Sequence, residues 1–221
     1  MNYRPDALFD LSHSLAAPLL ARFAYPWQAL PEIKDFIWAL GPTLPAEVYE
    51  QRGEEIWIAR SARVAPTASI TGPCIIGPET EVRHCAFIRG SALVGAGAVV
   101  GNSVELKNVI LFDKVQVPHY NYVGDSILGH KAHMGAGSVT SNVKADRALV
   151  VVHGPEGDLE TGLKKFGAIL GDSAEIGCNA VLNPGTVIGP RSSVYPLTAV
   201  RGVIPPDHIC KSMQIIVARQ G

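Results

Sequence analysis

The sequence predicts a mainly β protein in which short parallel strands wind into a β-helix of about seven coils. A small helical cap precedes the β-helix, and one long loop protrudes from it. Two observations carry this prediction: aliphatic residues recur every six positions in two runs, and a small or β-branched residue follows most of them four positions later. The composition agrees, because 221 residues that are 47% hydrophobic and 18% charged can bury a core in one or two domains.

The first run of the repeat starts at Ile58. Its aliphatic members are Ile58, Val64, Ile70, Ile76, Val82, Ile88, Val94 and Val100, and their small partners are Ala62, Ala68, Cys74, Thr80, Ala86, Ala92, Ala98 and Val104. Each small residue lies two positions before the next aliphatic residue, so strand alternation directs both to the same side. A six-residue period is typical of a β-helix with three short strands in each coil of about 18 residues, and with coils about 4.8 Å apart.

The second run follows a stretch in which the register slips. Its aliphatic members are Leu170, Ile176, Leu182, Ile188, Val194 and Val200, with Ala174, Ala180, Thr186, Ser192 and Thr198 as small partners. Residues 56 to 141 and 167 to 209 together predict a prism about 35 Å long. The same count places Cys74 inside this prism and Cys85 and Cys178 outside it.

Residues 1–55 are expected to form a separate helical unit, and residues 56–221 the β-helix domain. Apolar residues lie three and four apart in FDLSHSLAAPLLARF and from Pro31 to Leu40. Ser12 or Ser14 is a candidate capping residue, and Pro18 is expected to kink or end the first helix. The unit is interpreted as a cap over the open end of the repeat array, with a partner-binding arm as the alternative.

Charge and composition leave few partner classes. A net charge of −1 provides no basic stripe for nucleic acid and no polybasic segment for a membrane surface. The first residues lack the basic start and apolar run of a signal peptide, which favours a cytoplasmic protein. Four widely spaced cysteines without a CxxC pair are expected to be reduced thiols.

The repeat is interrupted by an inserted loop at residues 142–166. RALVVVHG and GDLETGLKK, joined at Pro155 to Gly157, predict a hairpin that protrudes from the prism. Insertions of this length in compact folds are usually functional or disordered.

Four motifs carry a resemblance to a known family: GNSVELKN, PHYNYVGDS, MGAGSVTSN and KKFGAILGD, in that order. They resemble the left-handed β-helix acyltransferases, and most closely the acetyltransferase domain of the bifunctional UDP-N-acetylglucosamine pyrophosphorylase/glucosamine-1-phosphate acetyltransferases. The first 55 residues contain no counterpart of that family's nucleotidyltransferase half. The resemblance implies left-handed coils, acetyl-CoA as co-substrate, a homotrimer, and an amino-sugar phosphate acceptor that feeds UDP-N-acetylhexosamine synthesis.

The resemblance places the family's general base at His119, with Tyr122 as its companion. The chemistry fits, because an amine must be neutral to attack a thioester. An imidazole with an ordinary pKa near 6.5 can accept the amine's proton at cellular pH.

Cationic and amide side chains are the candidates for binding the acceptor. Arg89 and Lys107 match the family's sugar-phosphate ligands, and their 18-residue separation stacks them on neighbouring coils, where an anion would relieve their repulsion. Asn142 matches a site asparagine. His133 stands where relatives have an asparagine, so the identity of the sugar is left open.

A loop lysine and two small residues complete the predicted site. Lys165 matches a lysine that reaches the sugar phosphate, with Lys164 as the second choice. Ala136 and Cys178 match positions that border the CoA arm, the second of which is usually a serine.

Two other function classes remain open. Hexapeptide-repeat carbonic anhydrases bind zinc through three histidines, and His84 and His119 lie close to two coils apart, but Gly124 occupies the position of that family's further histidine. A catalytically silent assembly or sugar-nucleotide-binding subunit would need none of the predicted site residues. The sequence therefore favours an amino-sugar phosphate N-acetyltransferase without a metal in its active site.

Overall fold

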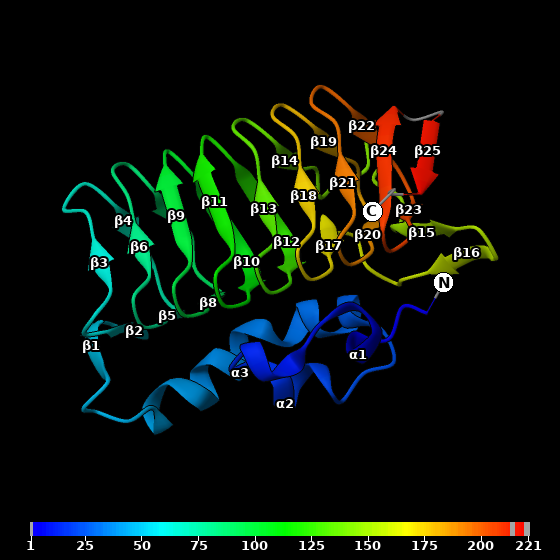
Figure 1. The fold of residues 1–221 in the computed structure, drawn as a ribbon. Coiled ribbons are helices and arrows are strands. Elements are labelled where there is room, and N and C mark those ends of the chain that lie inside the picture. Colours follow the sequence, from blue (N-terminus) through cyan, green and yellow to red (C-terminus); the bar gives the residue numbers. More distant parts are fainter. Residues whose placement is uncertain (1, 213–214, 219–221) are drawn as a thin grey trace.

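The chain forms a parallel β-helix with a helical segment along one side (Figure 1). The computed structural model describes residues 2–212 and 215–218. Each coil contributes a strand to each of three faces. Face 1 comprises β2 (Ile56–Ala59), β5 (Cys74–Ile76), β8 (Ala92–Val94), the ends of β10 (Glu105–Leu111) and β12 (Tyr122–Leu128), β17 (Ala168–Leu170), β20 (Thr186–Ile188) and β23 (Val203–Ile204). The coil count is close to the predicted seven.

The other two faces complete the prism. Face 2 comprises β3 (Arg63–Val64), β6 (Glu81–Val82), β9 (Val99–Asn102), β11 (Gln116–His119), β13 (His133–Met134), β18 (Glu175–Ile176), β21 (Ser193–Val194) and β24 (His208–Ser212). Face 3 comprises β4 (Ser69–Ile70), β7 (Phe87–Ile88), the starts of β10 and β12, β14 (Val139–Thr140), β19 (Val181–Leu182) and β22 (Ala199–Val200). Antiparallel strands β1 (Tyr49–Gly53) and β25 (Ile215–Ala218) pair with β2 and β24 at the two ends.

The predicted repeat fixes the register of the ladders. Ile58 pairs with Ile76, and Ile76 with Val94, at 18-residue spacing. Val94 then pairs with Leu111, and Leu111 with Leu128, at 17-residue spacing. Two coils therefore have one residue fewer at the corner between faces 3 and 1. This shortening is the register slip seen in the sequence.

The shortened corners have an unusual backbone. Strands β10 and β12 run without a break from face 3 to face 1, and each turns the corner on one residue with positive φ, Asn108 at 54° and Asp125 at 46°. Asparagine and aspartate tolerate this left-handed conformation better than most residues. The two polar side chains at these corners belong to the site described below.

The N-terminal segment is helical but more broken than predicted. It contains α1 (Pro5–Leu8), η1 (Leu11–His13), α2 (Ala17–Leu20), η2 (Pro26–Glu32), α3 (Ile33–Leu40) and η3 (Gly41–Thr43). Pro18 lies in the first turn of α2, where its missing N–H costs nothing, so it begins a helix instead of ending one. The Ser14 hydroxyl accepts from the Ala16 N–H, whereas Asp10 caps η1. No helix in the described part of the chain is long and apolar enough to cross a membrane.

The helical segment does not cover an open end of the array; it lies along face 1 (Figure 1). Its carbonyls at Leu8 and His13 accept from the N–H groups of Asp172 and Asp113, which belong to different coils. The helical segment lies there because face 1 is apolar on its outer side as well as on its inner side. The outward residues there are at most 8% exposed: Trp57, Ile75, Leu93, Ile110, Ile127, Ile169 and Val187. Burying each contributes about 1.5–3 kcal/mol, so this face requires a cover.

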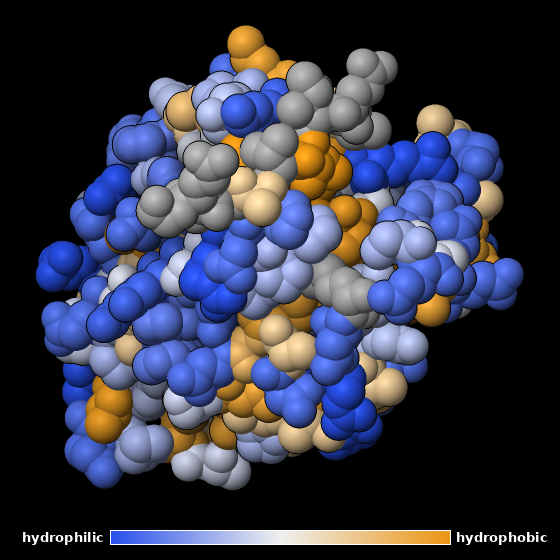
Figure 2. Space-filling view, turned by 45° about the vertical axis from the view of Figure 1, so that its right-hand side comes forward, coloured by the Kyte–Doolittle hydropathy of each residue, from blue (hydrophilic) through white to orange (hydrophobic). Residues whose placement is uncertain are grey.

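The inserted loop forms the predicted hairpin from β15 (Val151–Gly154) and β16 (Gly157–Glu160). It extends from the last coils, beside the N-terminus (Figure 1). The surface in Figure 2 is mostly hydrophilic, with apolar residues gathered in a narrow central band. Cys74 is buried while Cys85 and Cys178 are exposed, as the repeat predicts, and all four cysteines are free thiols.

Two stacked histidines join the helical segment to the β-helix. The rings of His13 and His130 lie 3.7 Å apart at 11°, and Nδ1 of His130 is buried without a hydrogen-bond partner among the described residues. Asp10 and Asp113 lie within 4 Å of the His13 ring. Burial, and secondarily the neighbouring His13, lowers the pKa of His130 below its ordinary value of 6.5.

This contact predicts an acid-sensitive stability. Because the unfolded state binds the His130 proton more tightly, the free energy of unfolding should fall as the pH drops from about 7.5 through 6.5 toward the lowered pKa. Burial also raises the pKa of Asp172, which accepts from the His130 N–H, so the His130 variant is needed to isolate the contribution of the histidine. Urea unfolding of His130→Gln at several pH values should show a flatter dependence, whereas the exposed control His84→Gln should retain the wild-type slope. An unchanged slope in His130→Gln would contradict the assignment.

Candidate functional site

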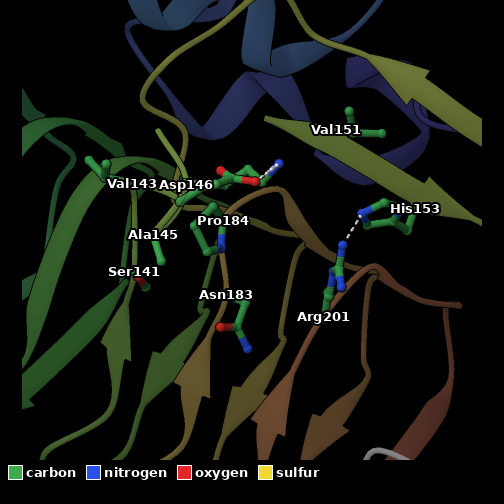
Figure 3. A pocket seen from close by; sticks show the side chains of 10 residues that line it. Ser141, Val143, Ala145, Asp146, Val151, His153, Asn183, Pro184 and Arg201 are labelled. Carbon is green, nitrogen blue, oxygen red and sulfur yellow. Dashed lines mark hydrogen bonds and ion pairs between the residues drawn. The ribbon is translucent and has the colours of Figure 1, made fainter. Parts of the chain in front are cut away.

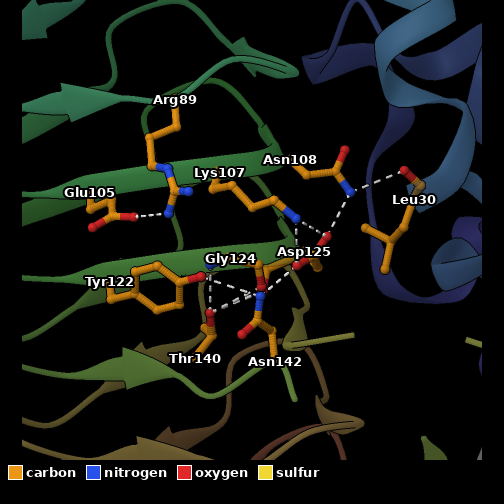
Figure 4. Close-up of polar contacts among 11 residues, drawn as sticks. Leu30, Arg89, Glu105, Lys107, Asn108, Tyr122, Gly124, Asp125, Thr140 and Asn142 are labelled. Carbon is orange, nitrogen blue, oxygen red and sulfur yellow. Dashed lines mark hydrogen bonds and ion pairs between the residues drawn. The ribbon is translucent and has the colours of Figure 1, made fainter. Parts of the chain in front are cut away.

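Five polar side chains meet at the shortened corner of β10 and β12 (Figure 4). The Asp125 carboxylate is 3% exposed and accepts from Lys107 Nζ at 3.0 and 3.1 Å. It also accepts from the Asn108 amide at 2.9 Å and from the Asn142 amide. The Asn142 amide reaches the Tyr122 hydroxyl at 3.2 Å as well. We call these residues the Asp125 cluster.

Coil stacking brings this cluster together. Lys107 lies beside Gly124 in the ladder between β10 and β12, so its side chain reaches the next residue, Asp125. Gly124 leaves room for the cluster, because a Cβ there would lie 2.5 Å from the Tyr122 hydroxyl oxygen and 2.9 Å from the Asn142 amide nitrogen. The returning loop closes the corner, since the Gly167 N–H donates to the Asp125 carbonyl at 2.8 Å.

The cluster perturbs one titratable group clearly. Burial, followed by the negative charge of Asp125, raises the pKa of the Tyr122 hydroxyl above 10. Tyr122 is therefore a neutral hydrogen-bonding group at cellular pH. Its hydroxyl can donate to a ligand while it accepts from Asn142.

Arg89 and Lys107 stack on neighbouring coils, as predicted, because Phe87 and Ile88 pair with Glu105 and Leu106. The expectation that only an anion would relieve their repulsion is wrong. Arg89 Nη1 donates to Glu105 at 2.7 Å, and Lys107 donates to Asp125 (Figure 4). Each cation thus has a carboxylate of its own, and an anionic ligand would compete with two ion pairs.

His119 lies at a different corner, between faces 2 and 3. It ends β11 and is exposed, and its ring has no hydrogen-bond partner among the described residues. The Gly137 N–H donates to the His119 carbonyl at 3.0 Å, and the Asn179 N–H donates to the Ala136 carbonyl at 2.8 Å. His119, Ala136 and Cys178 therefore follow one another along this corner.

The structure separates His119 from the Asp125 cluster. β11 belongs to the sheet of face 2, whereas β10 and β12 belong to the other large sheet. The Tyr122 side chain extends toward Gly124 and Asn142 (Figure 4). His133 stands apart from both, on face 2, where Nδ1 lies 2.8 Å from Glu175. In one chain the predicted base and the predicted phosphate ligands thus occupy opposite edges of face 3.

Lys165 is exposed, and its chain neighbour contacts the backbone of the Asp125 cluster. The next residue, Phe166, donates its N–H to the Asn142 carbonyl at 3.0 Å, and its ring is buried against Trp27. This anchor holds the backbone of Lys165 beside the cluster, and Lys164 is exposed as well. Among the described residues, no three His, Cys, Asp or Glu side chains lie close enough to hold a metal ion.

Sequence reasoning missed the centre of the cluster. Asp125 follows the glycine of PHYNYVGDS and was given no role, although it stands 18 residues after Lys107. An opposite charge one coil away was the available signal. Asn108 and Glu105 were also missed, and both are one or two residues from Lys107 in GNSVELKN.

Comparison with known proteins finds sequence similarity to acetyltransferases. A family model described as the GMPPB C-terminal domain matches residues 54–161. A bifunctional protein GlmU from Methanococcus maripaludis is 36% identical over 49% of this chain and 26% of its own length. A putative uncharacterized acetyltransferase, YaiX of Escherichia coli K12, is 28% identical over 76% of this chain and 74% of its own length.

The chain resembles the hexapeptide-repeat acetyltransferases. This confirms the resemblance predicted from the four motifs. The chain spans about a quarter of the length of that GlmU relative, so a bifunctional activity is not carried over to it. A solved structure, a putative acetyltransferase of Bacillus cereus, aligns with a TM-score of 0.39 at 22% identity over 69% of this chain and 70% of its own. The family resemblance therefore depends on the sequence matches.

Proposed function

We propose that the protein is an acetyl-CoA-dependent N-acetyltransferase of an amino-sugar phosphate, with glucosamine 1-phosphate and galactosamine 1-phosphate as the first candidates. The product would feed UDP-N-acetylhexosamine synthesis. The observation that carries the proposal is that face 3 has a candidate group at each edge: the exposed His119, whose ring has no hydrogen-bond partner among the described residues, at one, and the hydrogen-bonded Asp125 cluster at the other. A purely structural β-helix needs neither.

The Asp125 cluster is the proposed acceptor end of the site. Amide, hydroxyl and ammonium groups converge there, which suits the hydroxyls and phosphate of a sugar. Because Lys107 and Arg89 already have carboxylate partners, Lys165 is the cation best able to add a net positive charge for the phosphate. We expect it to take that role.

His119 is the proposed general base. The amine of the acceptor would lose its proton to the imidazole as it attacks the thioester carbonyl, and CoA would leave as the thiol. The small residues that follow His119 along its corner, Ala136 and Cys178, leave room for the pantetheine arm of CoA. No metal is required for this reaction.

A homotrimer would unite the two ends of the site. His119 and the Asp125 cluster lie on opposite edges of face 3, so one edge of a chain can meet the other edge of a neighbour. Closed cyclic assemblies use such unlike edges at every interface. The helical segment leaves face 3 uncovered for this contact, because it lies along face 1.

The decisive test measures thiol release from acetyl-CoA over a panel of amino sugars, their 1-phosphates and their nucleotide-linked forms. One amino-sugar 1-phosphate should give a kcat/KM far above that of the unphosphorylated sugar. A preference for a nucleotide-linked amino sugar would mean that the protein is still an amino-sugar N-acetyltransferase but acts on a different acceptor. Absence of turnover with every amine, while acetyl-CoA or a sugar nucleotide still binds, would favour the silent binding subunit instead.

The proposed homotrimer can be tested by measuring its mass in solution. Light scattering at micromolar concentration should give the mass of a trimer. A monomeric mass in a sample with full activity would contradict a site that is shared between neighbouring chains.

A further inference from the structure

A second polar groove lies at the base of the hairpin (Figure 3), and neither His119 nor a residue of the Asp125 cluster lines it. Its volume is about 480 Å³. The side chains that matter here are Lys144, Asp146, His153, Asn183 and Arg201, from the inserted loop and from two coils. No step of the proposed reaction uses them.

The coil side of the groove is a regular stack. Ser141, Asn183 and Arg201 each follow a paired strand, β14, β19 and β22, at the outer edge of face 3. The Ser141 N–H donates to Leu182 and the Asn183 N–H to Val200, which fixes the three positions on adjacent coils. At about 4.8 Å per coil, the backbones of Ser141 and Arg201 lie about 10 Å apart.

The hairpin side of the groove is held tightly against the coils. A Cβ at Gly202 would lie 2.6 Å from the His153 carbonyl oxygen, and a Cβ at Gly185 would lie 2.8 Å from the Val151 carbonyl oxygen. Val150 and Val152 are fully buried. This close docking means that the groove is formed before any ligand enters.

The groove contains two cations, Arg201 and Lys144, with different partners. Arg201 Nη2 lies 2.8 Å from His153 Nε2, and His153 Nδ1 lies 2.9 Å from Asp158. Because the guanidinium can only donate, Arg201 donates to His153 Nε2, which leaves His153 Nδ1 facing Asp158. Within residues 2–212 and 215–218, Arg201 has no carboxylate partner, whereas Lys144 is paired with Asp146 at 3.2 Å.

We propose that this groove binds a phosphate group of a nucleotide-type ligand through Arg201 and Lys144. A guanidinium that donates one N–H to an imidazole nitrogen, and is not paired with a carboxylate, has further donors for a phosphate and loses no ion pair on binding it. Lys144 adds a second cation, and the Ser141 hydroxyl is a neutral donor on the same wall. The phosphate can come from a nucleoside diphosphate or from CoA, which present the same chemistry.

The test is a direct binding measurement by calorimetry on the full chain, with UDP, CoA and 3′-dephospho-CoA as probes. Arg201→Gln should weaken binding of at least one probe by about 10- to 100-fold, the loss expected for a charge-assisted contact. Arg191→Gln is the matched control, because Arg191 is an exposed arginine paired with Asp207 outside the groove. Both variants remove one exposed charge, so both should fold.

Comparing the three probes identifies which ligand supplies the phosphate. If Arg201→Gln weakens the binding of UDP alone, the groove binds a nucleoside diphosphate. If it weakens the binding of CoA alone, the groove binds the co-substrate. If the wild type binds CoA but binds 3′-dephospho-CoA only weakly, the groove binds the 3′-phosphate of CoA. The proposal is overturned if no probe binds the wild type, if Arg201→Gln binds every probe as the wild type does, or if Arg191→Gln weakens binding equally. Because binding is measured without turnover, these outcomes are independent of the acetyltransferase proposal.

Discussion

Replacing His119 by alanine should lower kcat by about 10²- to 10⁴-fold, or about 3–5 kcal/mol of transition-state stabilisation, with substrate affinity little changed. The physical reason is the loss of a proton acceptor for the attacking amine. The loss should shrink as the pH rises, because more of the amine is then deprotonated without help. Steady-state kinetics from pH 6 to 9 on the best acceptor, with chemistry shown to be rate-limiting, would measure both effects.

His84→Ala is the control for His119→Ala. His84 is also an exposed histidine of the β-helix, but unlike His119 its ring is hydrogen-bonded, to the Thr67 hydroxyl at 2.7 Å. Its removal should leave kcat unchanged. If His119→Ala retains the wild-type kcat at neutral pH, the assignment is wrong and His133 becomes the next residue to test.

The separation of His119 from the Asp125 cluster permits a sharper version of this experiment. In mixed trimers of His119→Ala and Lys107→Met chains, an interface can combine an intact His119 from one chain with an intact Lys107 from the next. Random assembly from equal amounts should restore about a quarter of wild-type activity, because three quarters of the trimers are mixed and each has one intact site in three. A site contained in one chain would give no restoration.

The period of six, read alone, predicted the β-helix and its register well, because each coil repeats the same interior constraint. It also marked the place where the register slips. It could not show why, since a corner shortened by one residue depends on whether Asn108 and Asp125 accept a positive φ. That is a backbone property which hydrophobic spacing does not encode.

The position of the helical segment was predictable from residues that received no attention. An apolar residue recurs at the outward position of face 1 in coil after coil, from Ile75 and Leu93 to Ile169 and Val187. A solvent-facing strand would carry polar residues there. The outer side of face 1, and not the end of the array, was therefore the surface in need of a cover.

Only some of the predicted site residues lie near one another in the structure. Lys107, Tyr122 and Asn142 do come together, because stacking at one-coil spacing follows directly from the repeat. Their common partner Asp125 was overlooked because a motif aspartate at a turn has an ordinary structural explanation. His119 is separated from this group because the two lie at different corners, with face 3 between them, and sequence spacing alone does not resolve this.

Asp125→Asn should destabilise the fold by about 2–4 kcal/mol, because a nearly buried carboxylate that accepts from three side chains would become an amide. Lys107 would lose its counter-charge, and an amide hydrogen would face two amide donors. Backbone strain should not contribute, since asparagine tolerates the φ of 46° at this position as well as aspartate does. The acceptor KM should rise too, because Lys107 and Asn142 would no longer be held in place.

A double-mutant cycle isolates the ion pair within the Asp125 cluster. Adding Lys107→Met to Asp125→Asn should cost less than the sum of the two single losses by about 1–2 kcal/mol, because the unpaired ammonium is then gone. Urea unfolding gives all four free energies, and Asp6→Ala, which removes an exposed carboxylate beside Arg4, is the control expected to leave the midpoint unchanged. Strictly additive losses would mean that Lys107 and Asp125 do not depend on each other, and the cluster would then have to be regarded as separate surface contacts.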